Sequence, residues 1–169
     1  MRIKRKKYLV TGGAGFIGSH LVEKLINLDC KILCIDNLST GKLDNLPKDS
    51  SIIFFERNLL DIEDVELGSD LDGIFHLAAQ TAVPFSIKNF YESSENNLIG
   101  MLKVWDIARK KQIPIVYASS SAIYGNVEIG NDEIDSYEIL SPYALDKLTM
   151  EKYALMFLEL YKLRSIGLR

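Results

Sequence analysis

A chain of 169 residues can fold as one domain with a substantial hydrophobic core, and 47% hydrophobic with 25% charged residues is ordinary for a soluble globular protein. The formal net charge of −3 argues against nucleic acid or an anionic membrane as a partner of the whole chain. No stretch of the sequence approaches the roughly 18 apolar residues that span a membrane. A cytoplasmic protein is therefore expected.

Short apolar, β-rich runs alternate with longer helical patterns along the chain. The runs predict strands at residues 8–11, 31–36, 52–56, 73–79, 114–120 and 164–169. The helical patterns lie roughly at residues 16–28, 61–67, 89–111 and 142–162. The strand segments are hydrophobic almost throughout, as in a parallel sheet covered on both faces. The alternation predicts one α/β domain, a doubly wound parallel sheet of the Rossmann type with about six strands and helices on both faces.

A glycine-rich segment joins the first predicted strand to the first predicted helix. Gly13, Gly15 and Gly18 fit G-x-G-x-x-G, and Gly12, Gly15 and Gly18 fit the wider G-x-x-G-x-x-G. Glycines let the backbone approach a pyrophosphate, which the N–H groups at the helix N-terminus bind. A tight turn without a ligand can also be glycine-rich, so the motif needs a second element.

Asp36 supplies that element at the end of the second predicted strand. It lies eighteen residues after Gly18, where a carboxylate accepts hydrogen bonds from the ribose diol of a dinucleotide. A solvated loop aspartate is the simpler alternative. The negative charge would repel a 2′-phosphate, and the segment from Asn37 onward carries no cation before Lys42. The sequence therefore predicts NAD, rather than NADP, as the cofactor.

The last predicted helix has a clear start and a suggestive pair of side chains. Ser141 is a good N-cap and Pro142 suits the first helical position. Tyr143 and Lys147 are four residues apart and project from the same face. An ammonium group near a phenol lowers the pKa of the phenol and favours proton transfer. Such a pair also occurs by chance on surface helices, so it needs support from elsewhere in the chain.

Six segments in chain order carry a resemblance to a known family: TGGAGFIGSHL, DNLSTG, HLAAQ, NNLIG, SSSAIYG and SPYALDK. They resemble the extended short-chain dehydrogenases/reductases, specifically nucleotide-sugar epimerases of the UDP-glucose 4-epimerase kind. The resemblance implies that Tyr143 and Lys147 are the catalytic pair. It also implies that Ser120, four residues before Tyr124, is the third catalytic residue. The activity it implies is 4-epimerisation of a UDP-hexose through a 4-keto intermediate, with NAD bound throughout.

The same resemblance implies further contacts to NAD. Asn58 and Leu59 stand where family members usually hold an Asp–Ile pair against adenine, so Asn58 is a departure that would weaken this contact. The segment after the fourth strand would lie under the nicotinamide, and either residue of an Asn–Asn pair would contact the cofactor. Besides the catalytic pair, the expected contacts are Gly12, Gly15, Phe16, Ile17, Gly18, Asp36, Asn37, Asn58, Leu59, Leu77, Ala78, Ala79, Asn96 and Asn97.

Other chemistries of similar proteins are less well supported. Related dehydratases place Asp–Glu directly after the catalytic Thr, and decarboxylases place Ser–Glu there. This chain has Ser121 and Ala122 at these positions, which favours simple epimerisation. Two other classes stay open. One is a non-catalytic NAD-binding module, and the other is a reductase of a different small carbonyl substrate.

Two expectations about assembly follow from the resemblance. Family members continue beyond the last predicted strand into a nucleotide-sugar-binding region, so residues 1–169 would be the NAD-binding domain and the substrate region would be absent. A homodimer would form through helices 89–111 and 142–161. One stripe of the last helix should face the sheet and cofactor: Tyr143, Lys147, Met150, Ala154 and Phe157. A roughly opposite apolar stripe would need another cover: Leu145, Leu148, Leu155 and Met156.

The remaining cysteines and histidines predict structural roles. Cys30 and Cys34 lie within an apolar run, which favours buried thiols over a metal or redox site. His20 and His76 have no metal-like spacing. No metal is expected.

Overall fold

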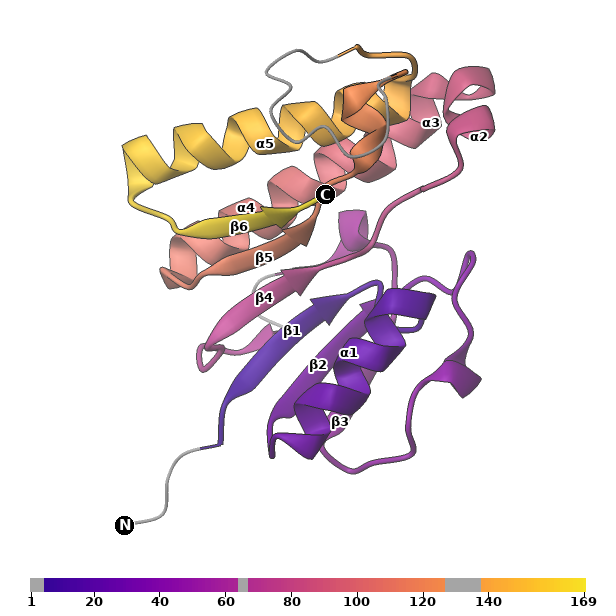
Figure 1. Cartoon of the computed structure of the whole chain (residues 1–169). Helices are drawn as coiled ribbons and strands as arrows, with labels where there is room; N and C mark the ends of the chain where they lie inside the picture. Colours follow the sequence, from indigo (N-terminus) through magenta and orange to yellow (C-terminus); the bar gives the residue numbers. More distant parts are fainter. Residues whose placement is uncertain (1–4, 64–66, 127–137) are drawn as a thin grey trace.

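The computed structural model describes residues 5–63, 67–126 and 138–169. One sheet of six parallel strands crosses the molecule in the order β3-β2-β1-β4-β5-β6 (Figure 1). The strands are β1 (Lys7–Thr11), β2 (Lys31–Asp36), β3 (Ile52–Glu56), β4 (Gly73–His76), β5 (Ile115–Ala118) and β6 (Ser165–Leu168). The chain steps outward from β1 to β3 and then returns to the other side of β1, as in a dinucleotide-binding Rossmann sheet. The predicted fold class is confirmed.

Helices and turns connect the strands. The helices are α1 (Phe16–Asn27), α2 (Val83–Lys88), α3 (Phe90–Ser94), α4 (Gly100–Lys111) and α5 (Pro142–Tyr161), with a π-helical turn, η4 (Glu95–Ile99), between α3 and α4. Among the described residues, 3₁₀ turns include η1 (Leu43–Asn45), η2 (Leu59–Asp61) and η5 (Ser121–Tyr124). The predicted helix 89–111 is therefore a helical segment interrupted by one wider turn.

One layer of helix packs on each face of the sheet (Figure 1). Successive residues of a strand point to opposite faces. On one face, Val10, Ile32 and Cys34 pack against Val22 and Leu25 of α1. This layer holds α1 directly over the first two strands and sets its N-terminus at their carboxyl ends.

The opposite face carries α4 and α5. Leu9, Ile74 and Ile115 of the sheet belong to one core cluster with Trp105 of α4 and Met150 of α5. The stripe of α5 that was expected to face the sheet is buried at every position: Tyr143, Lys147, Met150, Ala154 and Phe157. The orientation predicted for this helix is confirmed.

The predicted helix at 61–67 is wrong for the described part of that range. Residues 64–66 lie outside the described residues. Asn58 caps the single turn η2, and Ile62 already has extended backbone angles. Ile62 and Leu67 are both buried in the same core cluster, so burial alone accounts for their apolar character.

Smaller differences concern element ends. The predicted strands 73–79 and 114–120 end earlier, at His76 and Ala118, because the residues that follow turn into the loops of the site. The short helix α2 was not predicted. Its proline occupies one of the first two helical positions, where proline is tolerated.

Both cysteines are free and buried, as predicted. Burial, helped by the nearby Asp36 carboxylate, raises the pKa of the Cys34 thiol to about 12. The thiol therefore stays neutral near pH 7. It packs beneath Gly13, where an added Cβ would lie 2.3 Å from the sulfur.

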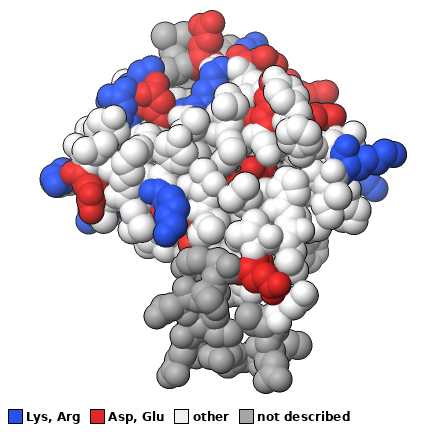
Figure 2. Space-filling model, turned by 90° about the horizontal axis from the view of Figure 1, so that it is seen from above, with Lys and Arg blue, Asp and Glu red and all other residues white. Residues whose placement is uncertain are grey.

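Charged residues of both signs are mixed on the surface seen from above (Figure 2). Within the described residues, this view contains no extended basic area of the kind that follows a nucleic-acid backbone. The absence of a nucleic-acid partner stays a prediction. None of the described helices has both the length and the apolar character that crossing a membrane requires.

Candidate active site

The residues expected in the site follow the carboxyl ends of five neighbouring strands. Because all strands are parallel, these ends meet at one edge of the sheet, where ligands bind in folds of this kind. The loops after β1 and β4 pack closely. Gly12 has a φ of 71°, and an added Cβ would lie 2.6 Å from the Ala78 backbone nitrogen. Ala78 N–H also donates to Thr11 Oγ1 at 3.3 Å.

The glycine loop fits a pyrophosphate. An added Cβ on Gly18 would lie 2.1 Å from the Gly12 carbonyl oxygen, so this glycine is required by the fold itself. At Gly15 the added Cβ would meet the same oxygen only at 3.3 Å. Gly15 is the N-cap of α1, and the N–H groups of Phe16 and Ile17 follow in the first turn. These groups lack intrahelical acceptors and are suited to bind an anion.

Asp36 lies at the end of β2 and organises the loops around it. Its Oδ2 accepts from Ala14 N–H at 3.0 Å, and its Oδ1 accepts from Leu38 N–H at 2.9 Å. The residue is buried. Each carboxylate oxygen has a second lone pair, so the group is placed to accept from a ribose diol beside the glycine loop.

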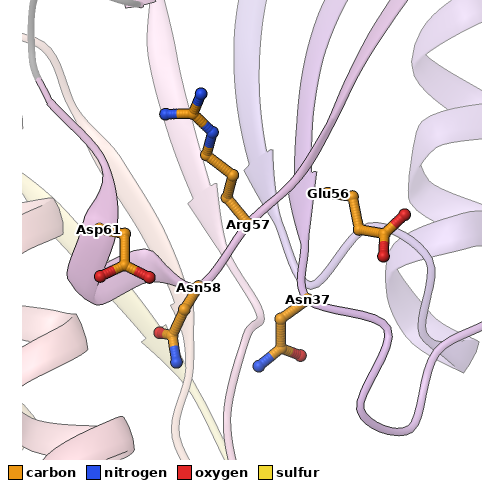
Figure 3. A pocket seen from close by; sticks show the side chains of 5 residues that line it. All are labelled: Asn37, Glu56, Arg57, Asn58 and Asp61. Atoms are coloured by element: carbon orange, nitrogen blue, oxygen red, sulfur yellow. The ribbon is translucent and has the colours of Figure 1, made fainter.

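A cavity of about 420 Å³ opens beyond the ends of β2 and β3 (Figure 3). It is lined by Asn37, Glu56, Arg57, Asn58 and Asp61. Asn37 directly follows Asp36. The glycine loop, the Asp36 carboxylate and the cavity therefore follow one another along the edge of the sheet. A dinucleotide held in this way would direct its first base into the cavity. Leu59, also expected there, is buried beneath it in η2.

Tyr143 and Lys147 lie on the buried face of α5. The Lys147 Nζ donates to the Ala118 carbonyl oxygen at 2.8 Å and lies 5.7 Å from the centroid of the Tyr143 ring. Burial lowers the pKa of Lys147 to about 8, and the neighbouring Asp146 carboxylate acts in the opposite direction. An ammonium group near its titration range therefore faces the phenol at the end of β5.

Ser120 begins the turn η5 directly after β5. Its Oγ accepts from Ala122 N–H at 3.1 Å and caps the turn. The turn η5 packs against α5, the helix that carries Tyr143 and Lys147. The three expected catalytic residues therefore lie on two adjoining elements.

The two residues of the Asn pair make different contacts. Asn97 is buried in the π-helical turn, where its side chain accepts from Gln80 N–H at 2.9 Å and donates to Gln80 O at 3.2 Å. It also donates to Asp146 at 3.3 Å, and that carboxylate accepts from Ser94 at 2.9 Å. Asn96 instead donates to Glu92 O at 2.8 Å. Asn97 thus joins the loop after β4 to α5.

Sequence reasoning missed two acidic residues near Tyr143 and Lys147. Asp146 is 2% exposed and holds the contacts just described. Glu151 accepts from Ser119 Oγ and is bound at both oxygens by Arg169, at 2.9 and 2.6 Å. Glu151 is four residues after Lys147 and on the same helix face, so helical spacing was a usable signal for it. Nothing local in the sequence marked Asp146.

His76 has the structural position expected for it. Its Nδ1 lies 2.8 Å from Thr11 Oγ1, and its ring packs edge-on against Trp105. Burial, followed by the charge of Lys147, lowers the pKa of His76 to about 3. The imidazole is therefore neutral near pH 7 and joins β1 to β4 beneath the site.

The model of the NAD dependent epimerase/dehydratase family matches residues 8–169. The chain belongs to this family. NAD is the family's cofactor, which confirms the cofactor predicted from Asp36 and the glycine loop.

Members of this family are similar to the chain over nearly its whole length. A putative UDP-glucose 4-epimerase of Methanocaldococcus jannaschii is 35% identical over 164 residues, 95% of this chain and 54% of that protein. The structure of a UDP-N-acetylglucosamine 4-epimerase from Methanobrevibacter ruminantium, in complex with UDP-N-acetylmuramic acid, is 38% identical with a TM-score of 0.92. The match covers 99% of this chain and 55% of that protein.

A UDP-glucose 4-epimerase of Thermus thermophilus, solved in complex with NAD, is 35% identical with a TM-score of 0.86. The match covers 96% of this chain and 54% of that one. The chain therefore spans about half the length of the relatives it matches.

Proposed function

We propose that this chain carries the NAD site and the catalytic Ser120, Tyr143 and Lys147 of an enzyme that epimerises a UDP-hexose at carbon 4. The observation that carries the proposal is the pairing of Tyr143 with a buried Lys147, which is anchored at the end of β5. The similarity to UDP-sugar 4-epimerases supports the substrate class.

Each catalytic side chain has a distinct role. Tyr143, as phenolate, takes the proton from the 4-hydroxyl of the sugar, and the Lys147 ammonium stabilises the phenolate charge. Ser120 donates a hydrogen bond to the same sugar oxygen. When bound, NAD supplies the acceptor and then the donor of the hydride at carbon 4. Once the 4-keto sugar has turned, carbon 4 accepts the hydride on its other face and is inverted, and Tyr143 returns its proton to the oxygen.

The cofactor would lie along the edge formed by the strand ends. The glycine loop and the first turn of α1 would bind the pyrophosphate, and Asp36 the adjoining ribose. The cavity beside Asn37 and Asn58 would receive the adenine. Leu77, Ala78 and Ala79 would lie under the nicotinamide, with Lys147 bound to its ribose.

The chain matches only about half the length of its relatives, and this affects the turnover expected of the chain alone. Residues 1–169 would form the NAD-binding domain, and the sugar nucleotide would be held chiefly by a region outside this chain. Remote binding energy positions the reacting sugar, so the chain alone should bind NAD but show little epimerase activity. The identity of the sugar would also depend on that region. Robust epimerisation by the 169-residue chain would contradict this division.

The proposed enzyme is a cytoplasmic homodimer. On the face of α5 away from the sheet, Leu145, Leu155 and Met156 are exposed, and a second subunit would cover them through α5 and the segment 89–111. Light scattering should give a dimeric mass at micromolar concentration, and a strict monomer would contradict the pairing.

One assay separates the proposal from its alternatives. A longer polypeptide that joins this chain to the proposed sugar-nucleotide-binding region is incubated with NAD and UDP-hexoses, while the sugar products and the absorbance at 340 nm are followed. A 4-epimerase interconverts the two sugars without net cofactor reduction. A dehydrogenase or reductase changes the 340 nm absorbance in proportion to product, and a dehydratase yields a dehydrated sugar. A non-catalytic module leaves both the sugars and the absorbance unchanged.

A further inference from the structure

The cavity beside Asp36 contains two carboxamides that are held in the same way. Asn37 Oδ1 accepts from Ser39 N–H at 3.1 Å, and Asn58 Oδ1 accepts from Leu60 N–H at 3.0 Å. Each side-chain oxygen thus accepts a hydrogen bond from the backbone N–H group two residues further along the chain. This arrangement fixes which end of each carboxamide faces the cavity, because only the oxygen accepts from an N–H group.

The free ends are therefore two N–H₂ groups. Figure 3 shows the side-chain nitrogen of Asn37 directed toward Asn58, and the side-chain oxygen of Asn58 on the side away from Asn37. Neither nitrogen donates to another described residue at hydrogen-bonding distance. Glu56 points away from this gap, and Asp61 lies beyond Asn58 (Figure 3). Side-chain donors thus border the gap between Asn37 and Asn58, and the Glu56 carboxylate is directed away from it.

Donors suit one type of purine edge better than another. Adenine presents ring nitrogens as acceptors and a 6-amino group as a donor, whereas a 6-oxopurine presents an oxygen acceptor at that position. The amide nitrogens can donate to N3 or N7 of either base, to N1 of adenine, or to the 6-oxo group of the 6-oxopurine, whose N1 carries a hydrogen and cannot accept. From these two side chains, the 6-amino group of adenine receives no acceptor.

We propose that Asn37 and Asn58 read the base of the dinucleotide as hydrogen-bond donors, so that the site binds the hypoxanthine analogue of NAD about as tightly as NAD. This inference rests on the proposed function, because it takes the cavity as the base site of the bound dinucleotide.

Asn58→Asp tests the inference with little change in shape. Aspartate is an equally good N-cap, so one carboxylate oxygen keeps the bond from Leu60 N–H and the other replaces the donor facing the cavity. Dissociation constants for NAD and for nicotinamide hypoxanthine dinucleotide are measured by calorimetry on the 169-residue chain. In the parent, the two values should agree within about threefold. In Asn58→Asp, NAD should be favoured by at least about fivefold more than in the parent.

Asp61→Asn is the matched control, since it changes a carboxylate that lines the same cavity. It should leave the ratio of the two constants unchanged. A parent that prefers NAD by tenfold or more, a ratio unmoved by Asn58→Asp, or a ratio that shifts in Asp61→Asn would overturn the inference and leave the epimerase proposal intact. Failure of the parent to bind either dinucleotide would overturn both.

Discussion

The ammonium of Lys147 lies 5.7 Å from the centroid of the Tyr143 ring, one helical turn away, and donates to the Ala118 carbonyl oxygen at 2.8 Å. This bond ties α5 to the end of β5. It also fixes the position of the charge relative to the phenol, so that both groups face the edge where the strand-end loops meet. The two side chains should therefore respond differently to substitution.

Tyr143→Phe should leave NAD affinity within about twofold of the parent, because the ring and its packing are kept. In a form competent for turnover, it should lower kcat by about 100-fold or more, since the acid–base hydroxyl is lost. Lys147→Met should lower both NAD affinity and kcat. Calorimetry and initial-rate assays distinguish the two, and a Tyr143→Phe variant with most of its activity would show that the assigned role is wrong.

Acid stability should depend on His76. The folded chain holds this imidazole neutral to about pH 3, while the unfolded chain takes up a proton near pH 6.5. The unfolded state therefore binds more protons between these values, and this contribution to stability falls as the pH falls. His76→Gln should reduce the loss of unfolding free energy between pH 7 and 5 by roughly 2 kcal/mol. Urea titrations at both values measure it, with His20→Gln as the surface control, and equal losses in parent and His76→Gln would contradict the prediction.

Substitution of two glycines in the same loop should have different effects, one on stability and the other on NAD affinity. In Gly18→Ala the new methyl group would meet backbone atoms of Gly12 and Gly13, so the free energy of unfolding should fall by about 3 kcal/mol. Gly15→Ala should stay within about 1 kcal/mol of the parent. Its methyl group would occupy the space proposed for the pyrophosphate, and NAD affinity should fall at least about tenfold. Thermal unfolding and calorimetry test both, and intact NAD binding by Gly15→Ala would place the pyrophosphate elsewhere.

Asp36 should control the choice between the two nicotinamide cofactors. Asp36→Ala removes the acceptors for the ribose diol, together with the bonds from Ala14 and Leu38. NAD affinity should fall about tenfold, and NADP should lose less because a repelling charge is removed as well. Calorimetry with both cofactors gives the ratio. Equal affinity of the parent for NAD and NADP would defeat this prediction.

The strand positions, the parallel sheet class and the glycine loop were predictable because their signals are local. Apolar runs mark buried strands, and the Gly18 and Asp36 positions follow directly from the strand–turn–helix pattern. The false helix at 61–67 shows the limit of this reasoning. Ile62 and Leu67 are buried in one core cluster, and Ile62 has extended backbone angles.

Contacts between distant segments left no comparable signal. The carboxylate of Asp146 meets Asn97 across 49 positions of sequence, and Asn97 meets Gln80 across 17. These pairs arise from the packing of α5 against the π-helical turn, which no local spacing encodes. The donor orientation of Asn58 likewise depends on a cap that only the three-dimensional turn reveals.

The most direct test of the central claim follows a deuterium label at carbon 4 of a UDP-hexose. It uses a longer polypeptide that joins this chain to the part by which its relatives extend beyond it, with Tyr143→Phe as the inactive control. If Tyr143 and Lys147 support oxidation and return of the hydride at that carbon, the epimerised sugar retains the deuterium and the control forms no epimer. Loss of the label to solvent, or the absence of any epimer from the active polypeptide, would contradict the account.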